Sequence, residues 1–539
     1  MQIIPRRPFI FFVAFSCLLL SAAPRPAKKV IYYGWDTPET NRFVAEFDAM
    51  KNLPFAGYVF CLDGTDSQGR FQGGMILTRR RYEEAGFEAL KPNLQKIAGM
   101  LQETPRELFA MIWSNPEDIS WFDDEGWSAI LHNTRLLARY ARLAGAKGFC
   151  FDPEPYTAAR PYNFQPGLGH SYAETAQKAR ERGTAFMKVI REEFPEAVLL
   201  TFGLWEWCFR GCAQIEFVDD ISAILENADF NLLAEFANGW LSAIDFPTRI
   251  IVAPEAAYHF ITADHYYGLA RQMKGSSCLA LRLIPEELHP AYRTHVDFGY
   301  GMFLDVYMER GAKDLCRQLE LACYNTDEYI WLYGERGKFW PGGEKTGIAT
   351  GEPWEKFIPE VLQALKFGQD PIQNGLLSNE NLAVNGDMSK GKEGYSEWLA
   401  DWSKGTMVAD NTGGRTGGAL RFNGVLEGTQ LLSFPVKPGE YFKISVWAKA
   451  QGESKPSCEI RWQTETGAWR QLQEASFVIR FPGADKDWVQ GTGYVRVPEG
   501  DAGRLVCLLY SRFGKDEQKD VVWFDDLDIR KIEFSAEEK

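Results

Sequence analysis

The stretch Gly148-Phe-Cys-Phe-Asp152-Pro-Glu154-Pro-Tyr156 has the pattern of a short buried strand that ends in two carboxylic acids. Side chains alternate along a strand, so Asp152, Glu154 and Tyr156 point the same way. The two prolines cannot donate hydrogen bonds to a neighbouring strand, which places them at the end of this one. The stretch therefore predicts a strand over residues 148–151 with a pair of acids just beyond it.

Short apolar runs alternate with helix-like segments on both sides of this stretch, from Lys29 to about Gly368. Eight strand–helix repeats in about 340 residues fit a TIM barrel better than an open, doubly wound sheet. No G-x-G-x-x-G motif follows the first expected strand, which removes the main support for a dinucleotide-binding fold. We therefore predict a (β/α)8 TIM barrel. Its expected strands cover residues 30–33, 57–62, 108–113, 148–151, 198–202, 250–253, 300–304 and 329–332.

The active site of such a barrel lies at the C-terminal ends of its strands, which is where Asp152 and Glu154 are expected. Their Cα atoms are separated by about 6 to 7 Å. Repulsion between two carboxylates in a partly enclosed pocket raises the pKa of one of them, which then becomes a proton donor near neutral pH. Acids at strand ends also cap helices or pair with basic neighbours, but the barrel context favours the functional interpretation.

The run G-F-C-F-D-P-E resembles the signature of family-18 glycoside hydrolases, in which a strand ends G-[apolar]-D-[apolar]-D-x-E. Cys150 and Lys147 stand where the family has acids, and the family's Met-x-Tyr-Asp feature on a later strand is not evident. The resemblance implies that Glu154 is the general acid. It also implies that Asp152 positions and stabilises an acetamido group of the substrate. The matching positions are Gly148, Phe149, Phe151, Asp152 and Glu154.

Polar and aromatic side chains at the ends of other expected strands are placed to reach the same cleft. Glu335, after the eighth strand, is the candidate for a second catalytic carboxylate if the mechanism uses two protein acids. Trp35 and Asp63 follow the first and second strands. Flat tryptophan rings often form platforms for sugars, although tryptophan is also common in protein cores. The candidate substrate-binding residues are Asp36, Trp113, Asn115, Tyr156, Trp205, Glu206, Glu255, Asp305 and Trp331.

The last third of the chain changes in character, because short alternating strands are separated by turn-rich spacers. This pattern predicts an all-β jelly-roll sandwich. The domain resembles the carbohydrate-binding modules of secreted glycanases at residues 381–387 (NLAVNGD) and 523–526 (WFDD). That resemblance implies a structural calcium ion. Ser389 stands where such modules usually carry a Glu ligand, whereas Asp525 and Asp526 keep the oxygen atoms that calcium prefers.

Residues 1–23 have the pattern of a secretory signal peptide, in which two arginines precede an apolar run that ends in small residues. The apolar run is shorter than the about 20 residues that a membrane-spanning helix needs. We therefore expect a secreted or periplasmic protein without an integral membrane span. We place the catalytic barrel at residues 24–375 and the β-sandwich at residues 376–539.

The composition of the 539-residue chain limits its partners. A formal net charge of −14 at pH 7 disfavours nucleic acid, because an acidic surface repels the phosphate backbone. The hydrophobic content of 45% is ordinary for a globular protein, whereas 17 Trp, 21 Tyr and 37 Phe make aromatic residues frequent. The acidic surface fits a neutral or cationic partner.

Together these features predict a secreted glycoside hydrolase that acts on a poly- or oligosaccharide and needs no cofactor for catalysis. A 2-acetamido group on the substrate removes the need for a protein nucleophile; otherwise Glu335 or Asp305 supplies one. A non-catalytic glycan-binding protein built on a hydrolase-like barrel is the alternative from another class. An ester or amide hydrolase is disfavoured, since no G-x-S-x-G motif is present and six His leave few candidate bases. The oligomeric state stays open.

Overall fold

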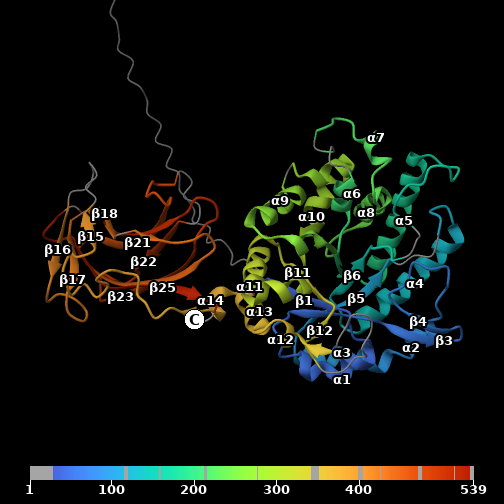
Figure 1. Ribbon diagram of the computed structural model, residues 1–539, viewed down its shortest axis with the longest axis horizontal. Coiled ribbons are helices and arrows are strands. Elements are labelled where there is room, and N and C mark those ends of the chain that lie inside the picture. Colours follow the sequence, from blue (N-terminus) through green and yellow to red (C-terminus); the bar gives the residue numbers. More distant parts are fainter. Residues whose placement is uncertain are drawn as a thin grey trace, which may run out of the picture.

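The computed structural model shows two domains, a barrel covered by helices and a β-sandwich beside it (Figure 1). It describes residues 28–534 except 115–118, 157–159, 212–214, 216, 276, 341–350, 398–404, 425, 432, 471–475 and 515. The expected signal peptide and the candidate residue Asn115 therefore lie outside the described residues. Within the described part of the chain, no helix is both long enough and apolar enough to cross a membrane.

The barrel strands are β1 (Lys29–Gly34), β2 (Gly57–Phe60), β5 (Glu107–Trp113), β6 (Gly148–Asp152), β7 (Val198–Thr201), β8 (Arg249–Val252), β9 (Val296–Phe298), β10 (Tyr300–Phe303) and β11 (Tyr329–Gly334). They pair in parallel in the order β10-β11-β1-β2-β5-β6-β7-β8-β9. β9 and β10 form one interrupted strand position that closes the ring between β8 and β11. The predicted (β/α)8 barrel is confirmed.

Gly299 lies at the interruption between β9 and β10. A Cβ atom there would lie 2.2 Å from the carbonyl oxygen of Tyr329, so only glycine fits this close approach. The strand predicted over residues 300–304 corresponds to β10, and β9 was not predicted from the sequence.

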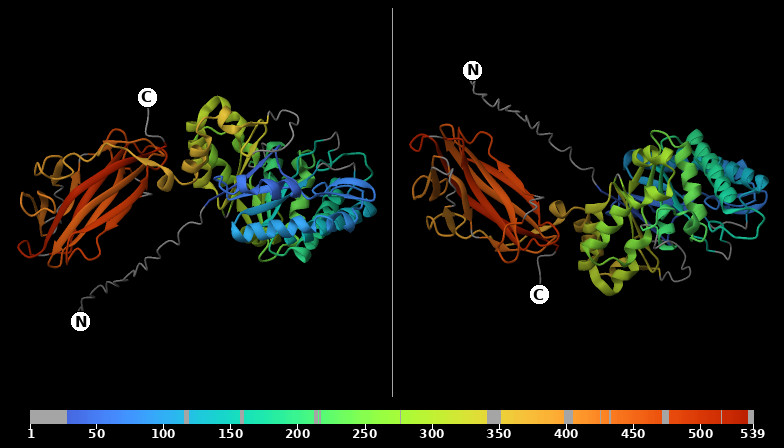
Figure 2. Two further views of the ribbon diagram at one scale, coloured as in Figure 1. Left: turned by 90° about the horizontal axis from the view of Figure 1, so that it is seen from below. Right: turned by 90° about the horizontal axis from the view of Figure 1, so that it is seen from above.

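Helices cover the outside of the barrel (Figure 2). Outward-facing strand side chains pack against their apolar faces; for example, the ring centroids of Phe151 on β6 and Trp240 on α8 are 5.2 Å apart. Ser171 and Glu174 form a capping box that starts the 22-residue helix α5. The helices are α1 (Thr40–Met50), α2 (Glu84–Glu88), α3 (Lys91–Glu103), α4 (Asp124–Leu143), α5 (Tyr172–Glu193), α6 (Trp205–Gly211), α7 (Ser222–Leu225), α8 (Asn231–Ala243), α9 (Ala263–Met273), α10 (His289–His295), α11 (Tyr307–Asn325), α12 (Trp354–Phe357), α13 (Val361–Gln369) and α14 (Pro371–Asn374).

Shorter elements complete this domain. They are the hairpin β3 (Asp63–Asp66) and β4 (Gly69–Gln72), the pair β12 (Gly337–Lys338) and β13 (Glu352–Pro353), and the 3-10 helices η1 (Glu255–His259), η2 (Leu279–Leu283), η3 (Glu286–Leu288) and η4 (Leu304–Val306).

Inward-facing side chains fill the barrel. Val59, Phe109 and Cys150 belong to this inner core, while their neighbours in sequence face the helices. Near the C-terminal ends of the strands, Trp331 stacks on Phe202 with ring centroids 3.8 Å apart. We call this end of the barrel, where the C-terminal ends of the strands lie, the mouth.

The C-terminal domain has two antiparallel sheets with strand orders β16-β17-β25-β20-β23 and β15-β18-β24-β21-β22. Their facing side chains form a separate hydrophobic core that includes Trp462, Phe442 and Phe524. The predicted β-sandwich is confirmed. Its strands are β14 (Leu376–Leu377), β15 (Tyr395–Glu397), β16 (Thr406–Asp410), β17 (Ala419–Asn423), β18 (Leu426–Leu431), β19 (Phe434–Pro435), β20 (Tyr441–Gln451), β21 (Lys455–Gln463), β22 (Phe477–Arg480), β23 (Val489–Arg496), β24 (Arg504–Arg512) and β25 (Val521–Glu533).

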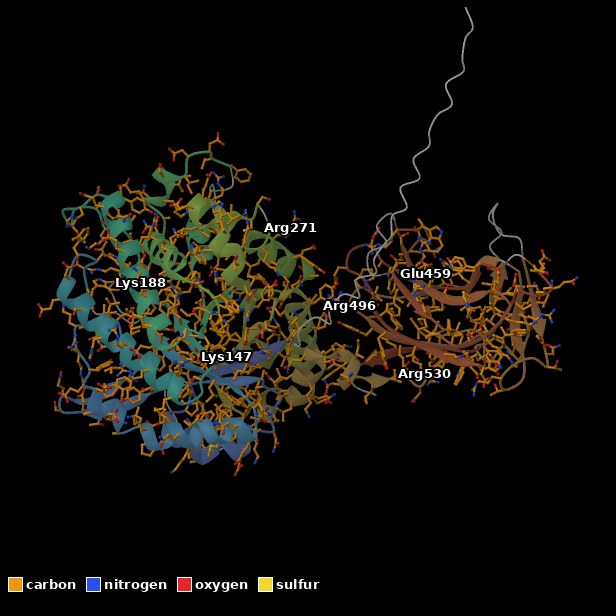
Figure 3. All side chains as sticks on the ribbon, turned by 180° about the vertical axis from the view of Figure 1, so that it is seen from behind. Lys147, Lys188, Arg271, Glu459, Arg496 and Arg530 are labelled. Carbon is orange, nitrogen blue, oxygen red and sulfur yellow. The ribbon has the colours of Figure 1, made fainter. Side chains whose placement is uncertain are left out.

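A buried carboxylate joins the two domains. Glu320 of α11 accepts hydrogen bonds from Arg496 at 2.7 and 3.0 Å and from the Tyr441 hydroxyl at 2.7 Å. The Arg496 guanidinium also lies 4.5 Å from the ring centroid of Tyr324. Figure 3 shows Arg496 at the junction between barrel and sandwich. Ile532 of β25 packs into the barrel-side hydrophobic core, so polar and apolar contacts both hold the sandwich in place.

Candidate active site

Asp152 is the last residue of β6, and its carboxylate is held from two sides. Oδ2 accepts a hydrogen bond of 2.7 Å from the hydroxyl of Tyr156, and Oδ1 accepts one of 2.9 Å from the backbone N–H of Glu154. Asp152 is 1% exposed, and this burial raises the pKa of its carboxyl to about 7. The negative charge of Glu154 adds to the rise. Near neutral pH, Asp152 therefore exchanges between its neutral and ionised forms.

Glu154 follows Asp152 by two residues and is partly exposed. The residues directly after β6 belong to no helix or strand, and the backbone N–H of Glu154 turns back to the Asp152 carboxylate. One acid is thus buried in the wall of the mouth and the other remains accessible to solvent. This difference in environment is what separates the roles of two neighbouring carboxyl groups in an acid-catalysed reaction.

Three tyrosines from other strand ends lie close enough to Asp152 to be affected by its charge. Burial raises the pKa of Tyr33, Tyr258 and Tyr333, and the Asp152 carboxylate raises each further. The rings of Tyr33 and Tyr333 stack with centroids 5.1 Å apart. The indole N–H of Trp113, a predicted site residue, donates to the Tyr33 hydroxyl at 3.4 Å. These tyrosines were not predicted from the sequence; Tyr33 and Tyr333 lie at the ends of β1 and β11, and Tyr258 lies in η1, which follows β8.

Two aromatic side chains near the mouth are open to solvent. Trp35, just after β1, is 46% exposed, and Tyr156, just after β6, is 59% exposed. The ends of β1 and β6 are three strand spacings apart in the ring, or about 14 Å along the sheet. Exposed rings on two sides of a carboxylate pair are suited to contact the apolar faces of sugar rings.

Glu335 and Asp305 meet at the ends of the eighth and seventh strand positions. The Tyr333 hydroxyl donates to Oε1 of Glu335 at 3.0 Å, and the backbone N–H of Glu335 donates to Oδ2 of Asp305 at 2.9 Å. Arg336 lies 3.8 Å from Asp305. Burial raises the pKa of Asp305. Tyr333 thus links this second pair of acids to the tyrosines near Asp152.

Asp36, Asp63 and Glu255 are also at strand ends. Asp36 forms an ion pair of 2.6 Å with Arg42, and Glu255 accepts a hydrogen bond of 3.4 Å from Tyr258. Burial, with the nearby charge of Glu39, raises the pKa of Asp63 to about 6. Of these acids, Glu255 has the most direct connection to the site, through Tyr258.

Three predicted substrate-binding residues lie below the surface instead. Trp205 is fully buried and donates to Asn238 at 2.9 Å, because α6 begins at Trp205 and turns its ring into the helical layer. Glu206 is buried and accepts from the backbone N–H of Leu204 at 3.0 Å. Trp331 is fully buried under Phe202 and donates to the Ala253 carbonyl at 2.7 Å. We therefore correct the expectation that Trp205, Glu206 and Trp331 line the cleft.

Asp525 and Asp526, the expected calcium ligands, are surrounded by hydrogen-bond donors. Asp525 is buried and accepts from the backbone N–H of Arg415 at 2.7 Å, while Asp526 accepts from the Arg415 guanidinium at 2.6 Å. Donors at these distances do not fit a cation in the same place. Among the residues that the structure describes, no group of three or more His, Cys, Asp or Glu is arranged to hold a metal.

No protein-family model and no curated protein sequence matches the chain. Among solved structures, the chain is similar to a psychrophilic glycoside hydrolase family 10 endo-β-1,4-xylanase, with 12% identity and a TM-score of 0.32 over 63% of this chain and 96% of that one. It is similar to the CBM22-1 xylan-binding domain from Paenibacillus barcinonensis Xyn10C, with 17% identity and a TM-score of 0.22 over 30% of this chain and 96% of that one. A match to the enzymatically active domain of bacteriophage CBA120 tailspike protein 4 has 14% identity and a TM-score of 0.23, over 28% of this chain and only 21% of that one.

Proposed function

We propose that the chain is a secreted glycoside hydrolase that cleaves glycosidic bonds in a poly- or oligosaccharide. The observation that carries the proposal is the pair Asp152 and Glu154 at the mouth of the barrel. One acid is buried with a pKa of about 7, the other is accessible, and aromatic rings adjoin both. An accessible carboxyl group beside a second, buried one supports protonation of a leaving sugar oxygen together with stabilisation of the charge that develops on the sugar.

Glu154 acts as the general acid in this mechanism. Its accessible carboxyl group donates a proton to the glycosidic oxygen as the bond to the anomeric carbon breaks. Asp152 in its ionised form stabilises the positive charge that develops on the sugar ring. The hydrogen bonds from Tyr156 and from the Glu154 backbone keep the Asp152 carboxylate in a fixed position during this step.

The second half of the reaction depends on the substrate. A sugar with a 2-acetamido group supplies its own nucleophile, and Asp152 then orients that group. For other sugars, Glu335 is the protein carboxylate that we assign to attack the anomeric carbon or to activate water. Its hydrogen bond to Tyr333, near Asp152, supports this assignment.

We assign the β-sandwich to glycan binding and the N-terminal segment to export. The alternation of short strands and the motifs at residues 381–387 and 523–526 support the first assignment, and the basic-then-apolar pattern of residues 1–23 supports the second.

Replacement of Glu154 by Gln tests the proposal. The full chain is incubated with a panel that includes xylan, chitin oligosaccharides, cellulose and mannan, and released reducing ends are measured. We expect wild-type turnover on at least one glycan and a loss of about 100- to 10,000-fold in the Glu154→Gln variant. Glu103→Gln, at the exposed end of α3, is the matched control and keeps wild-type activity.

The activity measurements distinguish a glycoside hydrolase from a non-catalytic glycan-binding protein. Equal turnover by Glu154→Gln and wild type would refute the assignment of the general acid. Binding of a panel glycan without release of any product from it would favour the non-catalytic glycan-binding protein.

A further inference from the structure

Two cysteine side chains touch inside the core of the β-sandwich. Cys458 lies on β21 and Cys507 on β24, and their Sγ atoms are 3.3 Å apart. The strands are antiparallel neighbours, with Cys458 opposite Leu509 and Cys507 opposite Ile460. The cysteines are therefore diagonal neighbours on the inner face of one sheet. Figure 3 marks strand β21 at Glu459, the residue next to Cys458.

The geometry brings these sulfur atoms near to bonding distance. A disulfide bond is about 2.05 Å long, so closing the gap requires a combined movement of about 1.3 Å by the two sulfur atoms. Diagonal partners on one sheet face lie about 7 to 8 Å apart, slightly beyond the usual Cα separation in a disulfide, so closure combines side-chain rotation with a small approach of the two strands. The register of the strands is unchanged.

Both thiols are shielded once the domain has folded. Cys458 is 0% exposed and Cys507 is 1% exposed. The hydrogen bond to Cys507, together with burial, raises the pKa of the Cys458 thiol well above its ordinary value. The thiolate is the form that attacks a disulfide, and an oxidant needs access to it. Any oxidation of this pair therefore occurs before the two sheets close over it.

We propose that Cys458 and Cys507 become linked by a disulfide bond while the sandwich folds in the presence of a protein or small-molecule disulfide. One cysteine thiolate attacks the carrier disulfide, which forms a mixed disulfide and releases one carrier thiol. The second cysteine thiolate attacks the chain sulfur of the mixed disulfide and releases the other carrier thiol. The chain loses two protons and two electrons, and the carrier is reduced to its dithiol form.

The bond would constrain the unfolded chain more than the folded one. It closes a loop between residues 49 positions apart, and cross-links over loops of this length stabilise a domain mainly by limiting its unfolded states. We expect the midpoint of thermal unfolding of the sandwich to fall by about 10 °C when the bond is reduced. This bond lies within the sandwich alone and is independent of catalysis by the barrel.

The test refolds the full chain from guanidinium chloride with oxidised and reduced glutathione and a disulfide isomerase. The folded protein is denatured, alkylated with iodoacetamide, digested and analysed by mass spectrometry. We expect a linked pair of peptides that contains Cys458 and Cys507 and disappears on reduction. A variant with Cys316→Ala and Cys323→Ala, both on α11 of the barrel, is the matched control and retains the linked pair.

The proposal would be overturned if both Cys458 and Cys507 were alkylated in refolded wild-type protein whose circular dichroism spectrum matches that of the native protein. A link from either residue to a different cysteine would overturn it as well. The double variant Cys458→Ala and Cys507→Ala provides a second measurement, because its unfolding midpoint should no longer respond to reductant. The wild-type alkylation result stands even if this variant fails to fold.

Discussion

The hydroxyl of Tyr156 donates a hydrogen bond of 2.7 Å to Oδ2 of Asp152, although the Tyr156 side chain is 59% exposed and Asp152 is 1% exposed. Tyr156 thus connects the solvent side of the mouth to a buried carboxylate. Its hydroxyl holds Asp152, and under the proposed function its exposed ring is available to contact a glycan.

Removal of this hydrogen bond should change the pH dependence of catalysis. The Tyr156 hydroxyl favours the ionised form of Asp152 and so lowers its pKa, which burial raises to about 7. In Tyr156→Phe the pKa of Asp152 rises further, by about 1 unit. Because Asp152 acts in its ionised form, the acidic limb of the pH profile of kcat/KM should move to higher pH. Tyr140→Phe removes a hydrogen bond to Glu88 on the outside of the barrel and should leave the limb unchanged.

Asp152 should reduce the stability of the fold at neutral and alkaline pH. Its folded-state pKa is raised from 3.8 to about 7, so its favourable contribution is present below about pH 4 and is lost as the pH rises through 7. Asp152→Asn removes this titration. We expect the variant to gain about 4 kcal/mol of unfolding free energy relative to wild type between pH 4 and pH 8.

Urea unfolding of both proteins at the two pH values measures this gain. A difference between variant and wild type that does not change with pH would show that the Asp152 carboxyl is not held in a buried, charge-disfavouring environment.

Trp35 should contribute to substrate binding and not to the fold. Its side chain is 46% exposed beside the site, so Trp35→Ala removes an accessible ring without opening a cavity in the core. We expect KM for an oligosaccharide substrate to rise about 3- to 10-fold with little change in the unfolding midpoint. Phe246→Ala, an 85% exposed ring between α8 and β8, is the control. An unchanged KM in Trp35→Ala would remove this residue from the binding surface.

The ion pair between Glu320 and Arg496 should hold the two domains together. Both side chains are below 10% exposed, so Arg496→Met leaves the Glu320 charge buried without its main partner. We expect a loss of about 3 to 5 kcal/mol in unfolding free energy, much of which the double variant Glu320→Met, Arg496→Met restores.

Arg142→Ala removes an exposed ion pair with Glu196 and serves as the control, with an expected change of at most about 1 kcal/mol. A similar loss in single and double variants would indicate that packing, and not charge pairing, dominates the junction.

Periodicity was sufficient to predict the barrel and the sandwich. The apolar runs at residues 108–113 and 148–151 correspond to β5 and β6, because a strand buried on both faces needs consecutive apolar side chains. The same reasoning placed Asp152 at the end of β6, which is where the structure has it, whereas the role of Asp152 and Glu154 stays a prediction.

The surroundings of the acids could not be predicted in this way. Tyr33, Tyr258 and Tyr333 come from different strands, and only the closed strand order brings them near Asp152. Trp205 was placed in the cleft because it follows a strand, but the chain starts a helix there and the period of two no longer applies. Trp331 does face inward, yet Phe202 covers it.

The dependence of rate on the leaving group tests the role of Glu154 most directly. The dinitrophenolate leaving group of a dinitrophenyl glycoside departs without being protonated, whereas a natural sugar leaving group needs a proton from the enzyme. With the sugar that the wild type accepts, Glu154→Gln should lose at least about 100-fold in kcat/KM on the oligosaccharide and less than about 10-fold on the dinitrophenyl glycoside. Equal losses on the two substrates, or no loss on either, would contradict the account.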